Sequence, residues 1–228
     1  MGRSYEQTCY IARSLDILGE RWTLLIVREL TLGPRRYGDL LGALPGIGTN
    51  LLATRLKDLE QNDIVRRAAL PGPGRAAAYV LTARGEALTP ALAALADWGA
   101  GLPEPPSHHT GRAAWIMVAM RLTAPQQAAA FDTITELQVG GEVLWLHGDG
   151  SQVRLAVGPA PVTPGLRLTC ERATFYALAA GRMTVDEACE SGDLAVDGGF
   201  AGAALFFTLF TLPAAARDPQ APSGAADA

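Results

Sequence analysis

Three polar side chains recur at helical spacing in one short segment of the first half of the chain. Asn50, Thr54 and Lys57 stand four and three residues apart, which places them on one face of a helix. A leucine stripe begins two positions further on, about 200° around the same helix, at Leu52, Leu56 and Leu59. The polar face could read base edges in the major groove of DNA, or it could be the solvated face of a helix that never meets DNA.

Cations surround this segment and could hold phosphates while the polar face meets the bases. Arg35 and Arg36 precede the segment, Arg55 and Lys57 lie within it, and Arg75 lies at a turn that could enter the neighbouring minor groove. The predicted DNA-binding set is Arg35, Arg36, Tyr37, Thr49, Asn50, Thr54, Arg55, Lys57 and Arg75.

The elements that must position these residues follow from apolar periodicity and from helix breakers. We expect left-handed caps at Gly19 and Gly33, and an N-cap hydroxyl from Thr49. The pattern predicts helices over residues 8–19, 21–33, 34–44 and 49–62, strands over 64–70 and 77–82, and a closing helix over 83–102. Helices, a tight turn, another helix and a hairpin follow one another in the order of a winged helix-turn-helix.

Three blocks of this half carry a family resemblance: CYIARSLDILGERWTLLIVREL, RRYGDLLGALPGIGTNLLATRLKDLE and YVLTARGEALTPALAALADWG. Over about residues 5 to 100 they resemble the HxlR family of bacterial winged-helix transcription regulators. The resemblance implies a homodimer, paired through its N-terminal and last helices, that binds a palindromic operator. It also gives Trp22 and Trp98 as structural tryptophans, which we interpret as core. The positions at which it implies DNA contact are Arg36, Thr49, Asn50, Thr54 and Arg55.

Cys9 lies at the predicted start of the first helix, where several members of the resembled family carry a redox-sensing cysteine. A helix N-terminus can lower the pKa of a thiol and raise its reactivity. The neighbours Thr8 and Tyr10 supply no cation, and many relatives have proline in place of Tyr10. We therefore expect a buried or inert thiol, and we keep redox sensing through Cys9 as an alternative.

Charge is distributed unequally along the 228 residues, whose net charge is −4. Residues up to Pro103 carry 12 basic and 10 acidic side chains, and the remainder carries 7 and 13. The first half could approach DNA, whereas DNA would repel the second half. We predict a DNA-binding and dimerisation domain over 1–103, a Pro- and Gly-rich linker over 104–111, a second domain over 112–212 and a disordered tail over 213–228.

The second half has a different pattern of elements. A helix over 112–122 precedes four short strands, with Gly140-Gly141 and Asp149-Gly150 as hairpin turns, and three helices and a strand follow. This pattern predicts an α+β fold with an antiparallel sheet. The run LRLTCERATFYALAAGRMTVDEACESGDLAVDG resembles the C-terminal part of sterol-carrier-protein-like domains, which enclose an apolar tunnel for lipids.

Large apolar side chains are frequent in this half, and a domain of this size needs most of them for its core. A second domain without catalytic groups, attached to a DNA-binding module, is explained as a sensor. We therefore predict a cavity for an apolar small molecule that modulates DNA binding. Its predicted lining is Trp115, Trp145, Phe175 and Phe210. The alternative is a lipid-binding or docking protein whose N-terminal domain only mediates assembly.

Catalytic, metal and membrane signatures are missing from the sequence. It has no GxSxG, no phosphate loop followed by Lys and no HExxH, and its three cysteines form no CxxC. No apolar run reaches the roughly 18 residues that cross a bilayer. We expect a cytoplasmic protein with no enzymatic activity, cofactor, bound metal or membrane contact. Its expected partners are a double-stranded DNA operator, a second copy of the chain and an apolar effector.

Overall fold

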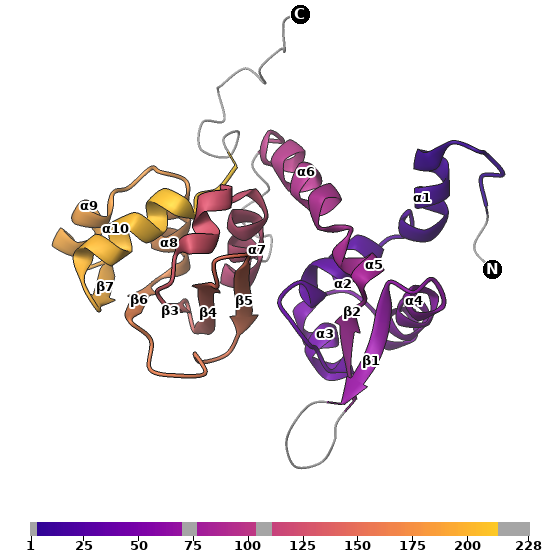
Figure 1. Cartoon of the computed structure of the whole chain (residues 1–228), viewed down its shortest axis with the longest axis horizontal. Coiled ribbons are helices and arrows are strands. Elements are labelled where there is room, and N and C mark those ends of the chain that lie inside the picture. Colours follow the sequence, from indigo (N-terminus) through magenta and orange to yellow (C-terminus); the bar gives the residue numbers. More distant parts are fainter. Residues whose placement is uncertain (1–3, 70–76, 104–110, 214–228) are drawn as a thin grey trace, which may run out of the picture. The chain divides into compact units, whose positions relative to one another are not determined.

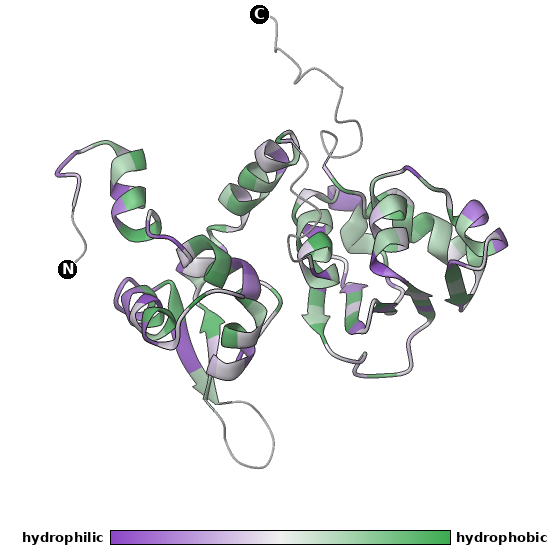
Figure 2. Ribbon diagram, turned by 180° about the vertical axis from the view of Figure 1, so that it is seen from behind, coloured by the Kyte–Doolittle hydropathy of each residue, from purple (hydrophilic) through white to green (hydrophobic). Residues whose placement is uncertain are grey.

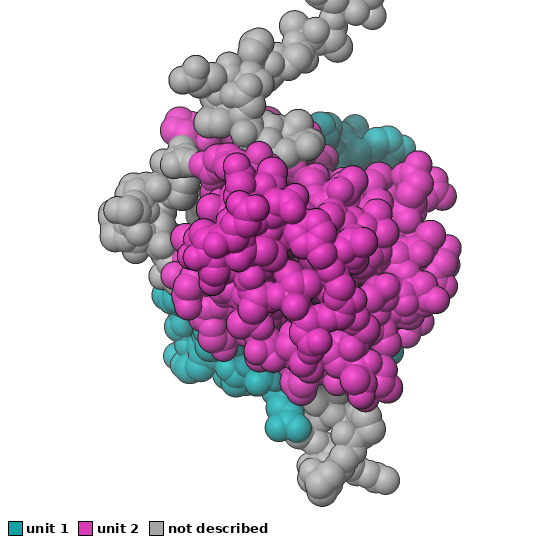
Figure 3. Space-filling model, turned by 90° about the vertical axis from the view of Figure 1, so that its left-hand side faces the viewer, with its two compact units in different colours: residues 1–92 teal, residues 93–228 magenta. Residues whose placement is uncertain are grey.

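The computed structural model describes residues 4–69, 77–103 and 111–213. The chain divides into two compact units, Met1–Leu92 and Ala93–Ala228, which Figure 3 shows in different colours. The predicted linker over 104–111 and the predicted tail over 213–228 lie outside the described residues, apart from Gly111 and Pro213. The domain boundary at Pro103 stays a prediction.

The first unit has the element order of a winged helix-turn-helix (Figure 1). The wing strands pair antiparallel, and Arg35 adds a single bridge to Tyr79. The predicted fold class of this half is confirmed, although its closing helix is split in two. The elements are α1 (Tyr10–Leu18), α2 (Thr23–Leu30), α3 (Tyr37–Ala43), α4 (Thr49–Gln61), β1 (Val65–Ala69), β2 (Ala77–Leu81) and α5 (Ala83–Glu86), and α6 (Thr89–Ala100) begins in this unit and continues into the second.

Aliphatic side chains from α2, α3 and α4 form the core of this unit. Ile26, Leu40 and Leu52 are completely buried, because the helical spacing of such residues gives each helix one apolar face. Gly85 lets α5 approach the start of the wing, since a Cβ at this position would collide with the carbonyl oxygen of Ile64. This packing holds α4 with its leucine stripe inward and its polar face outward.

Two of the predicted helix caps are wrong. Gly19 has a φ of −70°, in the right-handed helical region, whereas Gly33 has a φ of +100° and is left-handed as predicted. Thr49 is the first residue of α4, and the N-cap is Gly48, so no side-chain hydroxyl caps this helix. The helix begins one residue earlier than the Thr49 hydroxyl indicated, because glycine is also accepted at the N-cap position.

Two helices of this part of the chain leave apolar side chains exposed to solvent. Ile11 on α1 is 71% exposed, and Trp98 on α6 is 69% exposed. The interpretation of Trp98 as core is therefore wrong for the single chain, and Trp22 is only half-buried. The exposed large side chains on or next to these helices are Tyr10, Ile11, Leu15, Leu95, Trp98 and Leu102.

The second unit is an α+β fold built on a five-stranded sheet with the order β5-β4-β3-β6-β7. The predicted antiparallel sheet needs one correction: β3 and β6 run parallel, because the chain crosses back after β5 before it enters β6. The elements are α7 (Ala113–Thr123), η1 (Gln126–Ala130), β3 (Thr135–Val139), β4 (Glu142–Gly148), β5 (Val153–Val157), β6 (Leu166–Cys170), α8 (Arg172–Ala179), α9 (Val185–Glu190), β7 (Leu194–Asp197) and α10 (Phe200–Leu209).

The two faces of this sheet differ in polarity. Leu137, Leu144 and Leu168 are paired neighbours in the register and completely buried, so they share the face that the helices cover. Figure 2 shows the covering helices mostly in hydrophobic colours. The opposite face carries the pair Glu136 and Arg167, whose carboxylate and guanidinium lie 3.0 Å apart. None of the helices in the described part of the chain has the length and apolar character that a membrane crossing needs.

Candidate nucleic-acid interface

The outer face of α4 carries the three polar side chains that the sequence indicated. Asn50, Thr54 and Lys57 are exposed, and the leucine stripe on the other side of the helix is buried. Thr54 donates its hydroxyl to the carbonyl oxygen of Asn50 at 2.9 Å, so its oxygen can still accept a hydrogen bond from outside. Leu51 is partly exposed beside this row and offers an apolar contact of the kind that meets a thymine methyl group.

The start of α4 is held by Tyr37 at the start of α3. The Tyr37 hydroxyl donates to the carbonyl oxygen of Thr49 at 2.6 Å. The turn before α3 is fixed as well, since the amide of Arg36 donates to a carboxylate oxygen of Asp39 at 2.9 Å. The Arg36 side chain is exposed, and no carboxylate within the described ranges pairs with its guanidinium. Tyr37 thus positions the helix, and Arg36 presents a cation next to it.

The wing carries further cations. Arg66 on β1 is exposed, since its side chain alternates with that of buried Val65. Arg66 is not in the predicted DNA-binding set, although the alternation of the strand could have indicated it. Arg67 lies over the Tyr79 ring at 5.5 Å and pairs with Glu60 at 3.0 Å, and these two partners raise its pKa. The predicted wing-tip residue Arg75 lies outside the described residues.

Arg35 and Arg55 are partly buried, unlike the other predicted phosphate contacts. Arg35 exchanges two backbone hydrogen bonds with Tyr79, which ties the segment before α3 to the wing. One Nη atom of Arg55 lies 2.6 Å from Glu20, and the other lies 3.1 Å from Asp58. Arg55 therefore holds α4 against the segment between α1 and α2 in this conformation.

Cys9 is exposed, so the expected burial of this thiol is wrong, whereas its expected inertness stays a prediction. It occupies the N-cap position of α1, and the backbone amides of Ala12 and Ile11 lower the pKa of its thiol. α1 leaves most of its side chains in solvent and buries only Ala12, so the thiol at its N-cap is exposed as well. The thiol is thus accessible to a reagent and more acidic than usual.

The four residues predicted to line an apolar cavity do not come together. Phe175 and Phe210 are completely buried, in an aromatic cluster in which Phe206 and Phe207 lie 5.1 Å apart between ring centroids. Trp145 follows buried Leu144 on β4, so strand alternation turns it to the opposite face of the sheet.

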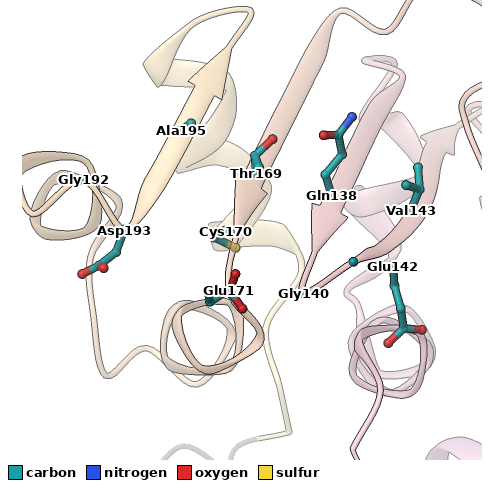
Figure 4. Close-up of a pocket in the computed structure, with 11 residues that line it drawn as sticks. Gln138, Gly140, Glu142, Val143, Thr169, Cys170, Glu171, Gly192, Asp193 and Ala195 are labelled. Atoms are coloured by element: carbon teal, nitrogen blue, oxygen red, sulfur yellow. The ribbon is translucent and has the colours of Figure 1, made fainter.

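Trp115 lies on α7, apart from the aromatic cluster, and lines a surface groove. A separate hollow of about 510 Å³ at the strand ends contains none of the four. Figure 4 shows it lined by polar groups that include Gln138, Thr169 and Asp193, together with Cys170. Burial raises the pKa of the Cys170 thiol to about 11.

Comparison with known proteins covers the winged part of the chain. The family model described as HxlR-like helix-turn-helix matches residues 17–106. The HTH-type transcriptional regulator YodB of Bacillus subtilis is 38% identical over 92 residues, which are 40% of this chain and 82% of YodB. The chain belongs to the HxlR-like helix-turn-helix family.

Other members of the family match over the same portion. An uncharacterized HTH-type regulator of Synechocystis, sll1512, is 42% identical over 94 residues, which are 40% of this chain and 70% of that protein. The solved structure of reduced YodB is 36% identical, with a TM-score of 0.38, over 44% of this chain and 100% of that chain. Both relatives are named HTH-type transcriptional regulators, the class of protein that the sequence predicted for this chain.

Proposed function

We propose that this HxlR-like protein binds a palindromic operator as a homodimer in the cytoplasm, with α4 in the major groove. The observation that carries the proposal is the outer face of α4. It presents Asn50, Thr54 and Lys57 to solvent, and no carboxylate among the described residues pairs with Lys57. A helix face with hydrogen-bonding groups and unneutralised positive charge fits base edges flanked by phosphates.

The residues of this face have different roles in the proposal. Asn50 and Thr54 read bases, since an Asn side chain can make two hydrogen bonds to adenine. Arg36 and Lys57 contact phosphates. The remaining members of the predicted set are Arg35, Tyr37, Thr49, Arg55 and Arg75, of which Arg75 enters the minor groove. The ion pairs of Arg55 with two carboxylates favour a positioning role for it.

The exposed apolar side chains on α1 and α6 support a homodimer. Ile11 and Leu15 lie four residues apart on α1, and Leu95 and Trp98 lie three residues apart on α6, so each pair shares a helix face. Large apolar groups that remain exposed in one chain mark a surface that a partner covers. Trp98 is then buried between two protomers, which reconciles its exposure with a structural role.

The C-terminal unit has a second proposed role, as a sensor for an apolar small molecule that changes operator affinity. The groove beside Trp115 supports this role, since it offers an apolar wall outside the packed core. The sterol-carrier-like tunnel has less support, because Phe175 and Phe210 are packed into the core.

Redox control through Cys9 is the alternative means of regulation. One observation favours it: the Cys9 thiol is exposed, and two helix amides lower its pKa. Loss of operator binding after mild oxidation of the wild type, absent in Cys9→Ser, would support this alternative over ligand sensing. Unchanged binding by the oxidised wild type would remove it.

Fluorescence anisotropy on labelled genomic fragments tests the proposed DNA binding. We expect a small number of fragments to bind more tightly than bulk DNA, with a stoichiometry of two chains per site. If every fragment bound equally, or if one chain occupied each site, the proposal of a dimeric operator-binding regulator would fail.

A further inference from the structure

A groove of about 510 Å³ lies between the start of α7 and α8 in the C-terminal unit. Its apolar walls come from Trp115 and Ile116 on α7 and from Ala173 and Tyr176 on α8. These two helices contact each other, so the walls belong to one packed body. The groove is therefore a formed surface feature with aromatic side chains from both helices.

Each aromatic wall has a guanidinium over its ring. The guanidinium carbon of Arg182 lies 4.7 Å from the Tyr176 ring centroid, and that of Arg112 lies 6.0 Å from the Trp115 ring. The quadrupole of an aromatic ring attracts a cation that lies over it, and this attraction restricts the motion of the ring. Walls that are held in place before binding reduce the entropy lost on binding a flat ligand.

Arg172 gives the groove a guanidinium that can bind an anion. Arg112 is already paired with Glu142 at 3.1 Å, and the second carboxylate oxygen of Glu142 accepts from the amide of Ala113 at 2.8 Å. Arg172 donates one hydrogen bond, at 2.7 Å, to the carbonyl oxygen of Gly111. Across the described ranges no carboxylate pairs with Arg172, so its other N–H groups can meet a ligand.

One carboxylate in the lining opposes the binding of an anion. Glu171 precedes Arg172 and is exposed. The charges of Arg112 and Glu142 cancel in their ion pair, and Arg172 and Glu171 are the other charged groups of the described lining. Arg172 thus offers one guanidinium to a ligand, which suits a single carboxylate.

We propose that this groove binds a small planar aromatic molecule with one carboxylate. The ring lies against Trp115 and Tyr176, and the carboxylate meets Arg172, whose planar guanidinium can make two parallel hydrogen bonds to it. Only the effect of this ligand on DNA binding rests on the proposed sensor role. The groove gives that role a site and a class of ligand.

Calorimetric titration of the full chain with 2-naphthoate and with its neutral analogue 2-naphthamide tests the proposal. The wild type should bind the carboxylate about tenfold more tightly than the amide, since the amide lacks the charge-assisted pair. Arg172→Gln should abolish the preference, and Trp115→Ala should weaken both ligands. Arg154→Gln is the matched control, because Arg154 pairs with Asp149 on the β5 side of the unit and does not line the groove.

Two results would overturn the inference: no saturable binding of 2-naphthoate, or a preference for it that survives in Arg172→Gln. If Arg172→Gln does not fold, Arg172→Lys replaces it and should keep only part of the preference, because lysine retains the charge without the planar fork. Operator affinity with and without 2-naphthoate separates the two claims. Binding without an effect on DNA would refute the sensor role alone, whereas operator binding by a chain that ignores 2-naphthoate would refute the groove alone.

Discussion

Removal of one proposed phosphate contact should change the salt dependence of DNA binding by a defined amount. Lys57 is exposed on α4, and no described carboxylate pairs with it. In a two-fold symmetric dimer Lys57→Ala removes two phosphate contacts. Each contact contributes about 0.9 to the slope of log K against log salt, so the slope should become shallower by about 1.8.

This change in slope has a consequence at fixed salt. Between about 50 and about 200 mM salt the affinity ratio of wild type to Lys57→Ala should shrink roughly twelvefold, because the variant releases fewer counterions. Anisotropy titrations of one operator at several salt concentrations measure both slopes. Arg36→Ala should behave in the same way, and Arg84→Ala, an exposed cation on α5 outside the predicted set, should leave the slope unchanged.

An unchanged slope in Lys57→Ala would refute the assignment of this side chain to a phosphate. A change in slope of about 0.9 instead of about 1.8 would support the phosphate contact but contradict the symmetric dimer, since only one protomer would then contact the DNA through Lys57.

Three further predictions concern the dimer, the core and the thiols. Trp98→Ala should shift the chain from dimer to monomer in sedimentation velocity, because it removes the largest apolar group that is exposed on α6, and an unchanged dimer would contradict the proposed surface. Gly85→Ala should lower the free energy of unfolding by roughly 1–3 kcal/mol through overpacking against the carbonyl oxygen of Ile64, as measured by urea denaturation. Iodoacetamide should modify Cys9 at lower pH than Cys170, because helix amides favour the Cys9 thiolate whereas burial raises the pKa of the Cys170 thiol to about 11. Equal pH profiles of modification for the two thiols would refute this difference.

The sequence predicted the elements of the first unit well because their signals are local. The spacing of Leu52, Leu56 and Leu59 predicts both the helix and its buried face, and the structure confirms them. The caps at Gly19 and Thr49 were wrong, since a helix end depends on one backbone angle that several residue types can adopt.

The candidate sites depend on contacts that a single sequence does not encode locally. The partners of Arg55 lie 35 residues before it and three residues after it, so only the folded chain shows that its guanidinium is engaged. The predicted lining of the apolar cavity was wrong for a similar reason: composition indicated that large side chains were available, but alternation along β4 separates Trp145 from Phe175 and Phe210. The exposure of Trp98 was missed because the type of an apolar residue does not tell whether it lies in the core or on the surface.

The most direct test of the central claim is the specificity of the wild type and of Asn50→Ala for an operator selected from genomic DNA. The account predicts a palindromic site, with half-sites about 10 bp apart, that the wild type prefers over bulk DNA. Asn50→Ala should lose roughly 1–3 kcal/mol of that preference per base read, while its affinity for bulk DNA stays the same. Gln61→Ala, at the exposed far end of the same helix, should keep the preference. A wild type without any preferred site, or an Asn50→Ala variant with undiminished preference, would contradict the reading of bases by α4.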